Sequence, residues 1–209
     1  MSKEYIGREK KERCVMKSVL ISIQPYWVFL IIAKKMGWKI GKEKNIEVRK
    51  NCPKGEKWDK KVKIYCSKDK KSFNRIPKEY QPLMELLLGK VIGEFVCNKI
   101  TYFGNISTDP WCSLLGDVHE SHKRLVTKDA CLTEKELLKY GGQYAWHISN
   151  LVIYDKPREL CEFKKINREC WYADLGLAKR DCPECQNEKC FIQRPPQSWC
   201  YVESEVQGE

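Results

Sequence analysis

Four cysteines in the C-terminal part of the chain have a spacing that suits a metal ion. They are Cys170, Cys182, Cys185 and Cys190, and the last three lie in the segment DCPECQNEKC. Four thiolates that include a C-x-x-C pair are typical ligands of a structural, tetrahedral Zn²⁺. Because the segment 161–193 has few aliphatic residues, metal binding could supply the stability that side-chain burial does not. We therefore predict that 161–193 is a zinc-binding insertion.

Other uses of these cysteines stay open at the level of the sequence. Cys161 or Cys200 could replace one ligand, four thiolates can also hold an iron–sulfur cluster, and the cysteines could be free in a loop. Disulfides are typical of exported proteins, but no cleavage site follows the apolar run Val19–Ala33. That run is also shorter than the ~20 residues of a membrane span. We expect a cytoplasmic protein with reduced thiols and no membrane segment.

A second group of residues that could do chemistry lies in the segment KNIEVRK, where polarity alternates. Glu47 and Arg49 share one face of an expected strand, and Ile46 and Val48 share the other. An arginine presents a planar fork that suits a phosphate or a base edge, and a glutamate can accept a hydrogen bond from an exocyclic amine. The alternative is a salt bridge on a solvated sheet face, which is worth ~0–1 kcal/mol.

The charge of the chain is concentrated around this segment. The net charge is +11, and residues 34–71 alone carry 15 basic and 5 acidic side chains. A localised basic region favours a polyanionic partner, most often nucleic acid, although a solvated lysine-rich surface has the same composition. Trp146 and Trp199 could offer stacking surfaces to bases, or they could belong to the core.

The elements that must position these residues are mostly strands. A β-branched strand at 18–24 leads into a helix that begins at Pro25 and ends near Gly37. A second helix is expected at 132–140, where Thr133 and Glu136 form a capping box. The remaining expected strands span 45–50, 61–68, 89–103 with a bend at Gly93, 144–155 and 198–203. Strands that do not alternate regularly with helices predict an α+β fold, a mixed β barrel with attached helices.

The order of these segments resembles the ASCH domain, a PUA-like β barrel. VLISIQPYWVFLI followed by NIEVRK is similar to the family's strand that ends in S-I-x-P, its helix, and its G-x-K-T-x-E-x-R strand. The segments KVKIYCSK, GKVIGEF, YAWHISNLVIYDKP and RPPQSWCYVE also resemble phage and bacterial members. The resemblance covers residues 17–203. It implies one domain over 18–203, with a basic arm at 1–17 and a tail at 204–209.

The resemblance implies two classes of function. PUA-like domains hold RNA or a modified base, which would place Ser22 and Gln24 near the ligand. Some ASCH proteins are amidohydrolases that remove the acetyl group of acetylcytidine with a lysine, a threonine and a glutamate. Lys44 and Asn45 match the first two positions, and asparagine cannot act as the same nucleophile. Candidates for the glutamate are Glu94, Glu134 and Glu136.

We therefore expect a protein that binds RNA or a modified nucleotide through a basic barrel face. The alternatives are an amidohydrolase in which Lys44 is catalytic, and a non-catalytic phage or bacterial adaptor that uses the zinc insertion for contact. The residues expected to bind the ligand are Ser22, Gln24, Lys44, Asn45, Glu47, Arg49, Lys50, Trp146 and Trp199.

Overall fold

The computed structural model describes residues 17–53, 60–102, 127–141, 144–166 and 191–204. The expected arm, apart from Lys17, and the expected tail, apart from Ser204, lie outside the described residues. The same is true of the four proposed zinc ligands, which are Cys170, Cys182, Cys185 and Cys190.

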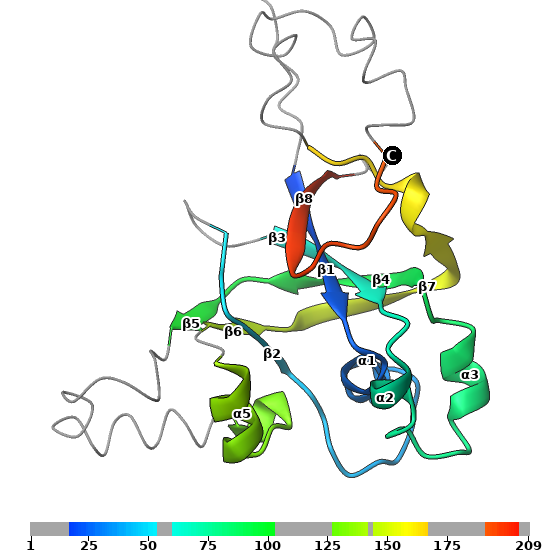
Figure 1. Cartoon of the computed structure of the whole chain (residues 1–209), viewed down its shortest axis with the longest axis vertical. Helices are drawn as coiled ribbons and strands as arrows, with labels where there is room; N and C mark the ends of the chain where they lie inside the picture. Colours follow the sequence, from blue (N-terminus) through cyan, green and yellow to red (C-terminus); the bar gives the residue numbers. More distant parts are fainter. Residues whose placement is uncertain (1–16, 54–59, 103–126, 142–143, 167–190, 205–209) are drawn as a thin grey trace, which may run out of the picture.

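In the described part of the chain, the larger of two sheets has five strands, in the order β7-β4-β3-β1-β8 (Figure 1). β1 (Lys17–Ile23) runs parallel to β3 (Lys60–Cys66) and antiparallel to β8 (Trp199–Glu203). On the other side, β4 (Lys90–Cys97) is antiparallel to both β3 and β7 (Ser149–Glu159). The strand near the start of the chain and the strand near its end are therefore neighbours.

The smaller sheet has three antiparallel strands in the order β2-β6-β5. They are β2 (Ile46–Arg49), β6 (Tyr144–His147) and β5 (Ile100–Tyr102). The sequence pattern predicted one long strand over 89–103 and another over 144–155, and the structure divides each of them between the two sheets. β4 and β7 enter the larger sheet, whereas β5 and β6 enter the smaller one. These two connections join the sheets.

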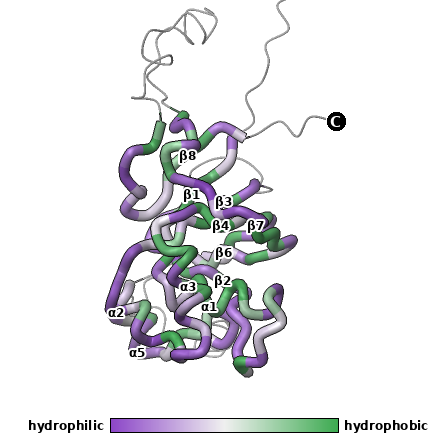
Figure 2. Tube along the Cα trace, turned by 90° about the vertical axis from the view of Figure 1, so that its right-hand side faces the viewer, coloured by the Kyte–Doolittle hydropathy of each residue, from purple (hydrophilic) through white to green (hydrophobic). Residues whose placement is uncertain are grey.

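The main hydrophobic core lies between the two sheets and helix α1 (Pro25–Ile32). α1 begins at the expected proline and buries Phe29 and Ile32. The same cluster contains Ile64 from the larger sheet and Trp146 from the smaller one. Figure 2 shows the chain from another side, with hydrophobic segments where β1, β3 and β4 lie next to one another. The two sheets therefore share one apolar interior.

Short helices complete the fold. α5 (Glu134–Tyr140) starts at the predicted capping box and covers the outer face of β2 and β6, where Leu137 packs with Ile46 and Val48. Other helices are α2 (Lys70–Phe73), α3 (Gln81–Glu85) and the 3₁₀ turn η2 (Leu160–Glu162), and residues 127–130 are helical as well. The predicted α+β class is confirmed, and α2 and α3 were not predicted.

The predicted irregularity at Gly93 is also present. The pairing of β4 with β7 shifts register between Val91 and Gly93. A Cβ added at Gly93 would lie 2.2 Å from the carbonyl oxygen of Val152. Glycine is required here because the backbone of β7 approaches too closely for any side chain.

Candidate functional site

A pocket of about 630 Å³ opens where the end of β1, the start of α1, β2 and α5 meet. Ser22 lies near the end of β1, and Gln24 is the residue between β1 and α1, which begins at Pro25. Lys44, Glu47 and Arg49 come from β2 and the residues before it. The pocket is completed by Ile23, Trp27, Val48, Ser67, Arg75, Leu132, Glu136, Lys139, Tyr140 and Gln197.

The alternation of β2 directs its polar side chains into this pocket. Ile46 and Val48 pack against α5 on the outer face, so Glu47 and Arg49 point to the opposite side. The alternative was a salt bridge on a solvated sheet face: the Glu47–Arg49 salt bridge is present, but the face is buried, because Glu47 is 6% exposed and Arg49 is 5% exposed. Both faces of β2 are buried, one in an apolar cluster and one in a polar network.

Glu47 is the centre of that polar network. Its Oε1 lies 3.1 Å from the Arg49 guanidinium, and its Oε2 lies 3.4 Å from the Nζ of Lys44. Lys44 also donates a hydrogen bond of 2.9 Å to the carbonyl oxygen of Ala130, and its Nζ lies 5.1 Å from the centre of the Trp27 ring. Burial lowers the pKa of Lys44, and the charge of Glu47 opposes that effect without cancelling it. The amine can therefore give up its proton more readily than an exposed lysine.

Arg49 connects the two sheets. It donates hydrogen bonds to the carbonyl oxygen of Ser22, at 2.7 Å, and to that of Ser198, at 3.5 Å. Within the described part of the chain, the Nε of Arg49 and the hydroxyl of Ser67 are buried without a hydrogen-bond partner. Both residues line the pocket, so the pocket wall holds polar groups that the fold itself does not satisfy.

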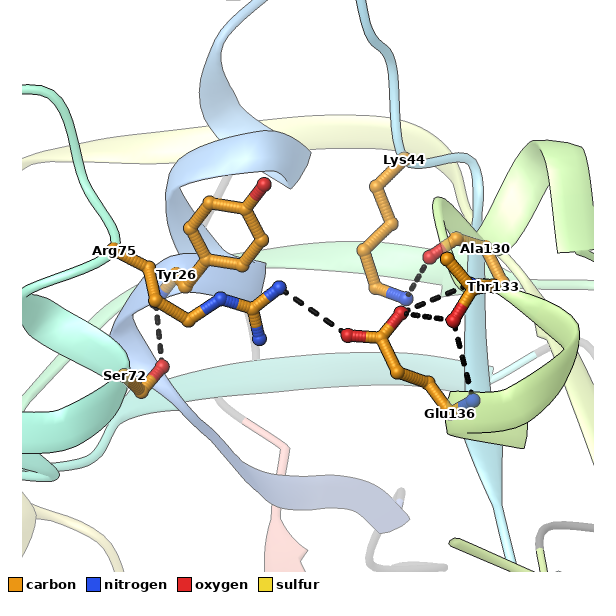
Figure 3. A network of polar contacts seen from close by, with 7 residues as sticks. All are labelled: Tyr26, Lys44, Ser72, Arg75, Ala130, Thr133 and Glu136. Carbon is orange, nitrogen blue, oxygen red and sulfur yellow. Dashed lines mark hydrogen bonds and ion pairs between the residues drawn. The ribbon is translucent and has the colours of Figure 1, made fainter. Parts of the chain in front are cut away.

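A second ion pair lies beside the Lys44 side chain. Arg75 follows α2, and its guanidinium is 3.4 Å from the Oε1 of Glu136 on α5 (Figure 3). The guanidinium lies over two rings, 4.0 Å from the centre of Tyr26 and 4.9 Å from that of Trp27. Tyr26 is held in turn by a hydrogen bond of 3.0 Å from its backbone N–H to the hydroxyl of Ser72. Arg75 and Glu136 therefore link the α2 and α5 sides of the pocket.

Glu136 is fixed by the residue that caps its helix. Its Oε2 accepts hydrogen bonds of 2.9 Å from both the backbone N–H and the hydroxyl of Thr133. Burial alone would raise the pKa of Glu136, but these hydrogen bonds and the charge of Arg75 lower it overall. Glu136 is therefore held ionised at neutral pH, with its second oxygen turned to Arg75.

The predicted binding residues fall into two groups. Ser22, Gln24, Lys44, Glu47 and Arg49 all line the pocket. The others do not line it. Lys50 is exposed, with its Nζ 5.5 Å from the centre of the Tyr140 ring, and Asn45 lines a different hollow beside Lys34. Trp146 is fully buried in the core, and Trp199 is half-buried against Tyr201. Trp146 therefore offers no ring face to a ligand.

Sequence reasoning missed several residues of this pocket. Trp27 reads as part of an apolar helix, and Arg75 follows a four-residue helix that has no periodic signal. Lys139 and Tyr140 were placed in the right helix but not at the site. Of the three candidate glutamates, Glu136 lines the pocket, while Glu94 lines a hollow elsewhere. The capping box was the signal that could have singled out Glu136.

Comparisons with known proteins find similarity to solved structures. Searches of family models and of curated protein sequences find no match. The structure is similar to a crystal structure of ASCH from Zymomonas mobilis, with a TM-score of 0.41 and 15% identity over 89% of this chain and 87% of that chain. A tyrosine-to-phenylalanine mutant of the same ASCH protein gives a TM-score of 0.39 and 15% identity, over 89% of this chain and 90% of that chain. ASCH is the family that the sequence resembles.

The described residues place limits on other kinds of site. No described helix has the length and apolar content that crossing a bilayer requires. No group of three or more His, Cys, Asp or Glu side chains suited to a metal ion occurs among the described residues. Cys161 is exposed, and burial raises the pKa of the Cys200 thiol to about 11. The pocket around Glu47 is the candidate site because five of the predicted binding residues line it.

Proposed function

We propose that this pocket binds one nucleotide of an RNA strand, with the base beside Arg75 and the phosphate beside the basic side chains. The charge of the pocket supports this proposal. The lining contains four basic side chains and two carboxylates. The basic side chains are those of Lys44, Arg49, Arg75 and Lys139, and the carboxylates are those of Glu47 and Glu136. The lining therefore has a cationic excess, which suits an anionic ligand.

The size of the pocket also supports a nucleotide. Its volume of about 630 Å³ lies in the range of pockets that enclose small organic ligands. Trp27 and Tyr140 add aromatic surface to a lining that contains both polar and aliphatic side chains. A base with polar edges and two apolar faces matches that mixture better than an apolar ligand or a simple ion would.

The observation that carries the proposal is the position of Arg75. Its guanidinium already lies over Tyr26 and Trp27, and it is partly exposed, with a side-chain exposure of 44%. Guanidinium planes are stacking platforms for unstacked bases of single-stranded RNA. Its ion pair with Glu136 is solvent-accessible and costs ~0–1 kcal/mol to break, so a ligand can displace it.

The test is binding of a short, labelled single-stranded RNA, followed by fluorescence anisotropy across a range of salt concentrations. Affinity should fall steeply with salt, because bound phosphates release counterions. Arg75→Gln should weaken binding by about tenfold, because the base loses a stacking platform, and it should leave the salt slope unchanged, because Arg75 contacts the base and not a phosphate. The control is Lys78→Gln, which removes one positive charge from an exposed position that does not line the pocket.

Two results would oppose the proposal. The first is no RNA binding by the unaltered protein at low salt. The second is an equal loss in Arg75→Gln and Lys78→Gln, which would mean that net charge matters and the pocket does not. Circular dichroism of each variant separates a loss of fold from a loss of binding.

Hydrolysis of a modified nucleoside is the second candidate function, and the buried amine of Lys44 favours it. A lysine whose pKa is lowered can act as a general base, and Glu47 and Glu136 line the same pocket. The residue at the threonine position of the ASCH motif is Asn45, which lines a different hollow, so Lys44 would have to activate water directly. Acetate release from acetylcytidine, lost in Lys44→Met and retained in Lys78→Gln, would support hydrolysis, and no release at high protein concentration would remove it.

A further inference from the structure

A second polar cluster lies at the opposite end of β1, on a face of the larger sheet. Lys63 of β3 and Glu94 of β4 are directly opposite each other in the antiparallel register. The Lys63 Nζ lies 3.0 Å from the Oε2 of Glu94 and donates a hydrogen bond of 3.3 Å to the Tyr154 hydroxyl. That hydroxyl donates in turn to the same Glu94 oxygen, at 3.0 Å. Three neighbouring strands thus supply one closed triangle of contacts.

Lys63 is fixed in place by its surroundings. It is 2% exposed, and its Nζ lies 5.4 Å from the centre of the Phe163 ring and 5.9 Å from that of Tyr154. Burying an ammonium group is costly unless it is paired, and Glu94 supplies the pair. A lysine held this way is a preorganised point charge, because its rotamer freedom is already lost.

The cluster contains more cationic than anionic side chains. Lys61 lies on the same face of β3, and its Nζ is 3.4 Å from the other oxygen of Glu94. Burial alone would raise the pKa of Glu94, but contacts with Lys63, Tyr154 and Lys61 lower it overall, so the carboxylate is ionised at neutral pH. Two ammonium groups against one carboxylate leave one uncompensated positive charge.

A hollow of about 380 Å³ opens beside these charges. Ser18 of β1 and Ser204 line it, and their hydroxyl oxygens are 2.6 Å apart in a mutual hydrogen bond. One hydroxyl proton of such a pair is used between the two serines, and the other remains for an outside acceptor. Asn150 also lines the hollow and brings an amide donor. The hollow therefore offers neutral donors next to a net positive charge.

We propose that this hollow is an anion site that binds a phosphate group between Lys61, Lys63 and the Ser18–Ser204 hydroxyl pair. Lysine binds phosphate as a point charge, and hydroxyls and amides donate to the remaining oxygens. Both oxygens of Glu94 already contact lysines, so the anion binds on the exposed side of Lys61, and the buried Lys63 contributes its charge. Nothing in this site depends on the nucleotide pocket, which is lined by other residues.

The test is thermal unfolding of the full chain in inorganic phosphate and in chloride at equal ionic strength. Phosphate should raise the Tm more than chloride does, because it binds the folded protein. Lys61→Gln should lower the apparent phosphate affinity about tenfold, the effect of losing one charge-assisted contact. Ser18→Ala should lower it by less, and Lys78→Gln should leave it unchanged. Lys61 is suited to substitution because its side chain is 44% exposed.

The same variants identify where the phosphate comes from and keep this site distinct from the pocket. If Lys61→Gln weakens both phosphate and single-stranded RNA, the ligand is the phosphate of a nucleic acid backbone. If it weakens inorganic phosphate alone, the ligand is a free anion. Phosphate and chloride with equal effects would overturn the proposal. So would a phosphate effect that is lost in Arg75→Gln but kept in Lys61→Gln, because phosphate would then bind in the nucleotide pocket.

Discussion

The Glu47 carboxylate lies 3.1 Å from the Arg49 guanidinium, and both side chains are more than nine-tenths buried. They are two residues apart on β2 and therefore point to the same side of the strand. Lys44 contacts the other carboxylate oxygen, so one buried anion compensates two buried cations. Because one carboxylate compensates two cations, substitution of Glu47 and substitution of one of its cationic partners should reduce the stability of the protein by different amounts.

Glu47→Gln should destabilise the protein much more than Lys44→Met. Loss of the carboxylate leaves two buried cations without compensation, and breaking a buried pair in this way costs about 3–5 kcal/mol. Loss of the Lys44 amine leaves Glu47 paired with Arg49, and the methionine fills the space of the lysine stem. Urea unfolding gives the free energy of each variant. Equal losses in the two variants would contradict this account.

The matched control for that pair of variants is Glu43→Gln. Glu43 makes an ion pair with Lys34 at 3.1 Å, and the two side chains are 48% and 73% exposed. An exposed pair contributes ~0–1 kcal/mol, so this variant should unfold close to the unaltered protein. Glu47→Gln and Glu43→Gln thus make the same chemical change, one at a buried position and the other at an exposed position.

The stability of the protein should rise at alkaline pH through Lys44. Its folded-state pKa is lowered from 10.5, because burial disfavours the charged amine. Between that lowered value and 10.5, the unfolded chain binds a proton here that the folded chain has released, so the free energy of unfolding increases with pH. Urea midpoints of the unaltered protein and of Lys44→Met should therefore diverge in favour of the former as the pH approaches 10.5. Parallel curves would mean that Lys44 titrates alike in both states.

Local signals in the sequence predicted the elements that hold the site. The start of α1 at Pro25, the capping box of α5 and the alternation of β2 are all confirmed, because each depends on residues close together in the chain. Five of the binding candidates line one pocket: the pattern gave Glu47 and Arg49, and the resemblance to ASCH gave Ser22, Gln24 and Lys44. The pattern could not show that the polar face of β2 is buried, because that depends on which sheet packs over it.

The division of long apolar segments between two sheets also could not be read from the sequence. Residues 144–155 are predicted as one continuous strand, yet they are divided between β6 and β7, which belong to different sheets. Trp146 consequently lies in the core between the sheets and not on a binding face. Arg75 enters the pocket because the short helix α2 and the turn after it carry it there, and no periodicity marks so short a segment.

Thr133→Ala should loosen α5 and the side of the pocket that this helix forms. The Thr133 hydroxyl accepts from the backbone N–H of Glu136, at 3.2 Å, and donates to the Glu136 carboxylate. Loss of such a cap costs about 1 kcal/mol. The pKa of Glu136 should also rise, because one of the hydrogen bonds that stabilise its ionised form is removed. Urea unfolding and carboxyl NMR titration measure the two effects, and Thr133→Ser should preserve both.

Zinc remains a prediction from the sequence, with Cys170, Cys182, Cys185 and Cys190 as ligands. Four thiolates in a tetrahedral site should hold about one Zn²⁺ per chain, measured by elemental analysis of protein purified without chelator. Cys182→Ser and Cys185→Ser should each lower that content, because both belong to the C-x-x-C pair. Cys52→Ser is the control, since Cys52 is a half-buried residue that packs against the main core. Chelator should lower the Tm of the unaltered protein, because metal binding to a site absent from the unfolded chain stabilises the fold. Protein that contains no zinc, and whose Tm is the same with and without chelator, would show that these cysteines have another role.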